Sequence, residues 1–226
     1  PLRREGGSSP WAEKAPPTMI IHTCPVGAFQ MNCYLVADEA TREGVVIDPG
    51  DEIPGLLDRI RREDLKIQAI LLTHGHVDHV MPAQDLKAAL NVPMCGHPDD
   101  RDLLQVAPQQ ALMFGLTPGP VPVLDRELVE GVPFQAGALT FRVLHVPGHS
   151  PGSVALLVGD CAFVGDTLFA GSVGRTDLPG GDFRQLARSI RGKLYALPES
   201  TVLYPGHGPA TTVGEERRTN PFVRAE

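Results

Sequence analysis

Residues 73–79 read Thr-His-Gly-His-Val-Asp-His, so four side chains that commonly bind metals fall within one short segment. They are His74, His76, Asp78 and His79. Groups of this kind are rarely buried without partners, because losing their hydration destabilises a fold. Packing alone gives no reason for such a density of imidazole and carboxylate groups. The segment therefore predicts a metal site, and the fold must bring the remaining ligands to this point.

Three further candidate ligands stand at isolated positions in the second half of the chain: His149, Asp166 and His207. Each follows an apolar run that is typical of a β-strand, just as the run 67–72 leads directly to His74. In α/β proteins the functional loops gather at the carboxyl ends of the strands. We therefore expect these distant residues to meet the first cluster at one edge of the sheet structure.

The rest of the chain alternates short apolar runs with stretches of helical spacing, which indicates an α/β fold. In the stretch 53–64, for example, Ile53, Leu56, Leu57 and Ile60 recur at helical spacing. Strands are predicted at about 19–24, 32–38, 44–48, 67–72, 139–146, 153–158, 161–165 and 201–204, and helices at about 53–64, 83–90 and 183–195.

The segment 99–135 does not follow this alternation. Its apolar residues Met113, Phe114 and Leu116 stand beside a run rich in proline and glycine. Long loops in compact domains are often functional. The segment is therefore either a lid that lines the substrate site or a surface connection.

A few polar residues lie outside the ligand pattern. His22 and His145 are predicted as strand residues, and His97 as a surface residue. Asp48 stands at the end of the predicted strand 44–48, where its carboxylate could accept a hydrogen bond from the metal loop.

Charge and composition narrow the range of partners. The chain has 20 Lys and Arg against 27 Asp and Glu, a formal net charge of −7, which argues against nucleic acid as a partner. No apolar run approaches the roughly 18 residues of a membrane span, so no membrane association is expected. The four cysteines are scattered without CxxC spacing and are expected to be buried free thiols, which fits a reducing cytoplasm.

One domain is expected over residues 18–226, since 226 residues with 42% hydrophobic content suit a single well-buried core. Residues 1–17 contain several prolines, glycines and serines and lack the apolar stretch of a secretory signal. We predict that they form a disordered N-terminal extension.

The spacing of the first cluster suits two metal ions. His74 and His76 can reach one ion while Asp78 and His79 turn toward a second, and a carboxylate such as Asp166 can bridge two cations. Two metals about 3.5–4 Å apart hold and acidify a water, so no nucleophilic side chain is needed. The sequence accordingly contains no GxSxG segment of the kind that carries a catalytic serine.

The motif of residues 74–79, followed by a later His, Asp and His, resembles the metallo-β-lactamase superfamily over roughly residues 19–222. The resemblance implies a four-layer αββα sandwich of the α/β (α+β) class, with two divalent metals at one edge of two packed sheets. Zinc is the first expectation for both ions, and iron or manganese are the alternatives. By the family pattern, the first metal would be held by His74, His76 and His149, the second by Asp78, His79 and His207, and Asp166 would bridge them.

Within that superfamily the chain looks most like the glyoxalase II group, the hydroxyacylglutathione hydrolases. The matching segments are residues 147–152, 165–169, 174–175 and 204–209. Arg175 matches a cationic position that contacts glutathione in that group, whereas Asp177 stands where those enzymes tend to have a tyrosine. The sequence also ends soon after His207, whereas full-length glyoxalase II continues into a helical region that helps to grip glutathione. The resemblance implies thioester chemistry without requiring glutathione.

The leading hypothesis is a metal-dependent hydrolase that cleaves a small-molecule thioester, such as S-lactoylglutathione, through a metal-bridging hydroxide. Asp78 and Asp166 would be its catalytic carboxylates. The alternative is a persulfide dioxygenase that oxidises glutathione persulfide, since residues 174–177 resemble that family as strongly. It would hold one Fe(II) through His76, His149 and Asp166. The acidic composition disfavours a nuclease, and seven intact ligands disfavour a purely structural metal site, which needs about four.

Overall fold

Several strands read as unbroken apolar runs because both of their faces are buried. All eight residues of β2 (Met31–Asp38) are buried in the computed structural model of the protein. Cys33 and Leu35 pack against helices on one side, while Tyr34 and Val36 pack against a second sheet on the other. Successive side chains of a strand point to opposite faces, so a strand with no polar face must lie inside a layered structure.

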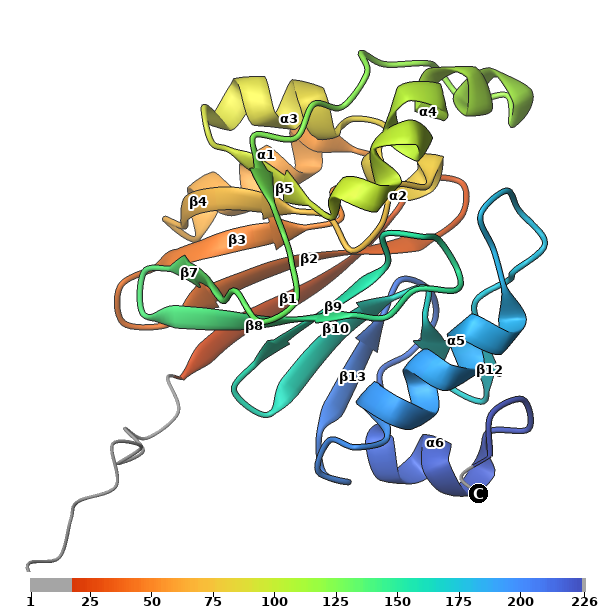
Figure 1. The fold of residues 1–226 in the computed structure, drawn as a ribbon. Helices are drawn as coiled ribbons and strands as arrows, with labels where there is room; N and C mark the ends of the chain where they lie inside the picture. The colour runs from red at the N-terminus through yellow and green to blue at the C-terminus, as the bar shows by residue number, and fades with distance from the viewer. Residues whose placement is uncertain (1–17, 225–226) are drawn as a thin grey trace, which may run out of the picture.

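The structure describes residues 18–224, which form four layers in the order helix, sheet, sheet, helix (Figure 1). This confirms the predicted αββα architecture. The first sheet contains, in spatial order, β1 (Met19–Val26), β2, β3 (Glu43–Ile47), β4 (Lys66–Leu71), β5 (Met94–Gly96) and β6 (Arg126–Glu127). Its outer face is covered by α1 (Ile53–Arg62), α2 (Val77–Val80), α3 (Ala83–Leu90) and α4 (Arg101–Met113).

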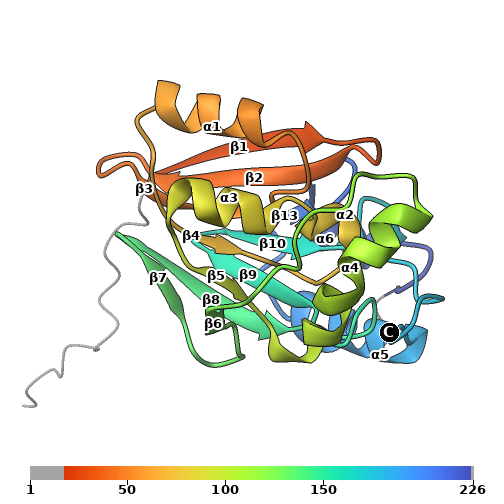
Figure 2. The same cartoon turned by 90° about the horizontal axis from the view of Figure 1, so that it is seen from above.

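The second sheet packs on the first and has its own helical cover (Figure 2). Its strands are, in spatial order, β14 (Thr211–Thr212), β13 (Val202–Pro205), β10 (Cys161–Gly165), β9 (Val154–Val158), β8 (Leu139–His145) and β7 (Phe134–Ala136). The outer layer consists of α5 (Phe183–Ser189), a π-helical turn (Ile190–Leu194) and α6 (Val213–Thr219). A small hairpin, β11 (Leu168–Phe169) and β12 (Ser172–Val173), follows β10.

Strand direction explains how distant residues come together. In the first sheet β3 and β4 are parallel, so their carboxyl ends share one edge. In the second sheet β10 and β13 are parallel. Strand β9 lies between β8 and β10 and is antiparallel to both, so β8 runs in the same direction as β10. The loops that follow these five strands carry all seven predicted ligands.

The predicted elements are largely present. Helix 53–64 corresponds to α1, whose Leu56 and Ile60 are buried as its spacing predicted. The predicted helix 183–195 consists of α5 and the π-helical turn. For the segment 99–135 the sequence predicts no helix. This is wrong for residues 101–113, which form α4. The predicted extension 1–17 lies outside the described residues.

Three of the four cysteines, Cys33, Cys95 and Cys161, are buried free thiols as predicted, and Cys24 is half-buried. Burial raises the pKa of the Cys33 thiol well above its usual range and that of Cys95 to about 12. Within residues 18–224, no helix combines the length and the apolar character that a membrane crossing requires.

Candidate metal centre

The carboxyl ends of β3 and β4 build the first part of the site. β4 leads through Thr73 to His74, and Asp48 follows β3 with its backbone in the left-handed region, at φ 48°. The buried Asp48 carboxylate accepts hydrogen bonds from the Thr73 amide at 2.8 Å, the Thr73 hydroxyl at 2.6 Å and Nδ1 of His79 at 3.0 Å. Asp48 therefore accepts hydrogen bonds from the metal loop, as the sequence predicts.

His74, His76 and His149 form what we call the three-histidine group. Nε2 of His149 lies 3.2 Å from Nε2 of His74 and 2.8 Å from Nδ1 of His76, so three ring nitrogens converge on one point. All three side chains are buried. Three converging imidazoles are a typical ligand set for zinc or iron.

Asp78, His79 and His207 form what we call the mixed group. Oδ2 of Asp78 lies 3.1 Å from Nε2 of His207 and 3.8 Å from Nε2 of His79. His207 reaches this position because β13 ends beside β10, whose own loop carries Asp166. The group offers two imidazoles and one carboxylate, which also suits a divalent ion.

The carboxylate of Asp166 lies between the two groups. Its oxygens are 3.6 Å from Nε2 of His149, 3.4 Å from Nε2 of His79 and 3.7 Å from Nε2 of His207. Gly206 makes this approach feasible, because a Cβ there would lie 2.1 Å from Oδ1 of Asp166. The structure thus brings together all seven residues that the sequence singled out, in the two sets that the family pattern implies.

Two buried side-chain atoms of the site lack a hydrogen-bond partner that a bound cation could replace. Nε2 of His79 and Oδ1 of Asp166 are buried and have no hydrogen-bond partner. Buried polar atoms are normally paired, so orphan atoms need an explanation. The two atoms lie 3.4 Å apart. A divalent ion coordinated by both would satisfy them, and the residues present therefore fit a two-metal centre.

The two groups differ in their electrostatics. Burial, reinforced by the neighbouring histidines, lowers the pKa of His74 well below its usual range and that of His76 to about 4. Burial alone would also lower the pKa of His79, but the carboxylates of Asp166 and Asp78 raise it well above its usual range. A lowered pKa favours the neutral imidazole, so His74 and His76 keep a lone pair free for a metal.

Backbone carbonyls orient two of the histidines from behind. Nδ1 of His149 donates to the Arg175 carbonyl at 2.8 Å, and Nδ1 of His207 donates to the Phe29 carbonyl at 3.2 Å. A donor at Nδ1 places the lone pair on Nε2, the atom that faces the centre.

The sequence interpretation missed one important residue, Asp100. Its buried carboxylate accepts hydrogen bonds from the Gly75 amide at 2.8 Å, the Ser150 hydroxyl at 2.7 Å and the Gly152 amide at 2.6 Å. Gly75 lies between two ligands of the first sheet, and Ser150 directly follows His149. Asp100 therefore fastens together the two loops that supply the three-histidine group. An aspartate just before a helix gives no local signal of such a role.

The histidines outside the pattern have structural partners. His22 contacts Glu63, and Nε2 of His145 donates to the Pro151 carbonyl at 2.8 Å. The prediction of His97 as a surface residue is wrong, because it is buried in a parallel stack with His145, with ring centroids 4.0 Å apart. Parallel stacked rings cannot both point their lone pairs at one ion, so this pair is not a second metal centre.

Arg175, the predicted substrate-binding residue, is exposed and bound by a carboxylate of its own chain. Its Nε and Nη2 donate to the two oxygens of Asp177 at 2.7 and 2.8 Å. The bidentate pair compensates the charge that was expected to contact glutathione.

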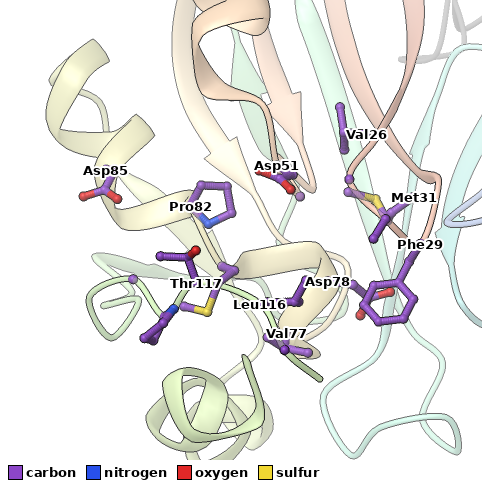
Figure 3. A pocket seen from close by; sticks show the side chains of 17 residues that line it. Val26, Phe29, Met31, Asp51, Val77, Asp78, Pro82, Asp85, Leu116 and Thr117 are labelled. Atoms are coloured by element: carbon purple, nitrogen blue, oxygen red, sulfur yellow. The ribbon is translucent and has the colours of Figure 1, made fainter. Parts of the chain in front are cut away.

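A cavity of about 370 Å³ opens beside the mixed group (Figure 3). Asp78 and Phe29 lie at one end of it, and Leu116 and Thr117 form part of its wall. Residues 115–119, in the middle of the segment 99–135, therefore line this cavity. Phe114, just before this wall, packs edge-on against Phe29 with ring centroids 5.8 Å apart.

Comparison with known proteins agrees with this geometry. The family model described as metallo-beta-lactamase superfamily matches residues 26–207. The chain belongs to the metallo-β-lactamase superfamily. A relative from Haemophilus influenzae named hydroxyacylglutathione hydrolase GloC is 41% identical over 212 residues, covering 92% of this chain and 100% of that protein.

Solved structures of this superfamily superimpose on most of the chain. BLEG-1, a B3 metallo-β-lactamase, matches with a TM-score of 0.84 and 36% identity, covering 90% of this chain and 99% of that one. TTHA1623 in a di-iron-bound form matches with a TM-score of 0.82 and 46% identity, covering 89% and 99%. ETHE1 from Myxococcus xanthus matches with a TM-score of 0.77 and 30% identity, covering 90% and 84%.

Proposed function

We propose that the protein is a binuclear metal-dependent hydrolase that cleaves the thioester bond of a small acyl-thiol. The observation that carries the proposal is the position of Asp166 between two ligand groups, within 3.7 Å of a histidine nitrogen of each. The likeness to the Haemophilus influenzae hydroxyacylglutathione hydrolase supports a thioester such as S-lactoylglutathione. The likeness to TTHA1623 in its di-iron form supports two ions, with iron as well as zinc a candidate.

The residues divide the chemistry between them. Two divalent ions held by the seven ligands would supply an acidified water and positive charge for the developing oxyanion. Asp78 lines the cavity with its side chain 20% exposed, so its carboxylate can orient a water toward a substrate carbonyl. In the reaction a C–O bond forms and the C–S bond breaks, and the proton lost by water ends on the released thiol. A thiolate leaves readily, so the site needs no strong general acid.

The test combines metal content with turnover. The protein would be purified without added metal, and its metal content measured together with hydrolysis of S-lactoylglutathione. We expect about two ions per chain and release of free thiol. Hydrolysis of a β-lactam with no activity toward thioesters would contradict the proposed substrate class.

A persulfide dioxygenase is the second candidate. The likeness to ETHE1 fits it, and His76, His149 and Asp166 lie close enough to hold a single iron. The complete mixed group favours two ions and hence the hydrolase. One iron per chain, oxygen uptake with glutathione persulfide and no thioester hydrolysis would reverse this ranking.

A further inference from the structure

The cavity beside Asp78 has an acidic lining. Among the described residues that line it are three aspartates, Asp51, Asp78 and Asp85, and no lysine, arginine or histidine. Asp78 belongs to the mixed group, where a bound cation would compensate its charge. Asp51 and Asp85 have no such compensation. Their charges therefore act on whatever part of a substrate extends away from the metal centre.

The two uncompensated carboxylates lie apart from the metal ligands. Figure 3 shows Asp85 at the end of the cavity opposite Asp78 and Phe29, with Asp51 on the wall between them. Asp51 accepts a hydrogen bond from the Glu52 amide, and within residues 18–224 no cation pairs with either carboxylate. Both side chains are exposed to solvent.

The remaining walls suit an apolar chain that ends in a cation. Val26, Met31 and Leu116 contribute apolar surface. Phe29, which lines the cavity, is 44% exposed and forms an edge-to-face pair with Phe114. Aromatic faces beside carboxylates attract ammonium groups, through the ring quadrupole and through direct charge attraction.

The expected anion contact near the centre is compensated from within the chain. Arg175 donates both of its bonds to Asp177, at 2.7 and 2.8 Å. Glutathione carries two carboxylates and one ammonium, a net charge of −1, so its thioesters would bring an excess of negative charge to a cavity lined by Asp51 and Asp85. Electrostatic complementarity decides between substrates of similar size and shape.

We infer that the cavity receives an ammonium-bearing arm of the thioester substrate and selects against an arm whose net charge is negative. The inference rests on the proposed thioesterase activity, since it concerns the substrate of the same site. It assigns Asp51 and Asp85 as the residues that determine charge selectivity.

The test uses three thioacetates that differ mainly in charge. They are acetylthiocholine, which is cationic, its neutral carbon isostere S-(3,3-dimethylbutyl) thioacetate, and the anionic S-acetyl-3-mercaptopropionate. With the metal-loaded protein, kcat/KM should fall in that order, with about a tenfold difference between the first and the last at low salt. Equal values, or a preference for the anionic ester, would overturn the inference.

Variants show whether the two carboxylates cause the preference. In Asp51→Asn/Asp85→Asn the ratio of kcat/KM for the cationic ester to that for the anionic ester should fall to about threefold or less. The control Glu39→Gln/Asp64→Asn removes the same charge from two exposed residues outside the cavity lining and should keep the wild-type ratio. A ratio that is unchanged in the cavity variant, or equally reduced in the control, would contradict the assignment.

Binding separates this inference from the proposed function. Dissociation constants of the uncleavable S-methyl thioethers of the same three thiols can be measured by calorimetry on the metal-loaded protein. Tighter binding of the cationic thioether with no ester hydrolysis would contradict the hydrolase but support the charge selectivity. Hydrolysis of all three esters without a charge preference in binding or turnover would support the hydrolase and contradict the selectivity.

Discussion

The three-histidine group and the mixed group share Asp166 but differ in burial and charge. His74, His76 and His149 are 3%, 6% and 2% exposed, whereas the side chains of Asp78 and His207 are 20% and 29% exposed. The first group consists of imidazoles, of which His74 and His76 have lowered pKa values, and the second contributes a carboxylate that also lines the cavity. Under the proposed function, the buried half of the centre would retain its ion, and the half with the partly exposed Asp78 and His207 would admit the substrate.

Removing the shared ligand should have the largest effect. In Asp166→Ala neither group keeps a bridge, so we expect at most one ion per chain and a loss of kcat/KM of about a thousandfold, equal to about 4 kcal/mol. Metal analysis and thioester hydrolysis measure both quantities. Asp160→Ala, at the exposed turn between β9 and β10, is the matched control and should stay near wild type. Near-normal turnover in Asp166→Ala would exclude the bridging role.

Metal removal should distinguish the two groups directly. With a chelator in excess, we expect two phases of metal loss, and the ion of the mixed group should leave first, about tenfold faster, because solvent reaches its ligands. Activity should disappear with the first phase. His207→Ala should abolish the fast phase and leave the slow one. A single phase in the wild type would contradict the difference between the groups.

The two supporting carboxylates should act on different ions. Asp48 supports His79 of the mixed group, and Asp100 supports the loops of the three-histidine group. Asp48→Asn should weaken binding of the fast-leaving ion by about ten- to a hundredfold, and Asp100→Asn should act similarly on the slow one. Competition with a metal indicator would measure both constants. Asp99→Asn, next in the chain but with its side chain 57% exposed, is the control.

The smallest effect is expected at the edge of the three-histidine group, where the Arg175 carbonyl accepts from His149 and its guanidinium binds Asp177. That guanidinium lowers the pKa of Asp177 to about 2, so the pair persists at all pH values above this. Asp177→Asn frees the arginine and should lower KM for S-lactoylglutathione about two- to threefold. In the double variant Arg175→Ala/Asp177→Asn, the KM for S-lactoylglutathione should return to about the wild-type value. A KM unchanged by Asp177→Asn would indicate that Arg175 does not contact the substrate.

Much of the fold could be predicted because its strands are buried on both faces and end at functional loops. The apolar run 67–72, for example, identifies β4 and places His74 beyond its end. The sequence does not predict α4 because Pro108 lies inside it and proline and glycine dominate the residues that follow. Its buried residues Leu103, Leu104, Ala107 and Ala111 nevertheless recur at helical spacing.

The remaining errors concern contacts between distant segments. His97 is buried because its ring stacks on His145 of the other sheet, and a pattern read along the chain contains no trace of that pairing. The role of Asp100 likewise depends on hydrogen bonds to residues 25 and 52 positions away, such as Gly75 and Gly152. The metal ligands can be identified from a short stretch of sequence, whereas the residues that hold them in place can be identified only from the tertiary structure.

The ligands follow strands of both sheets, four in the loop and helix α2 after β4 and three in the loops after β8, β10 and β13. Ions bound there act as a clamp between the halves of the sandwich, in addition to the apolar interface. A ligand that binds only the native state at a hundred times its dissociation constant adds about 2.7 kcal/mol to the free energy of unfolding. Resistance to denaturation would then depend on the supply of metal ions, because an emptied centre leaves the two sheets joined by packing, hydrogen bonds and the chain itself.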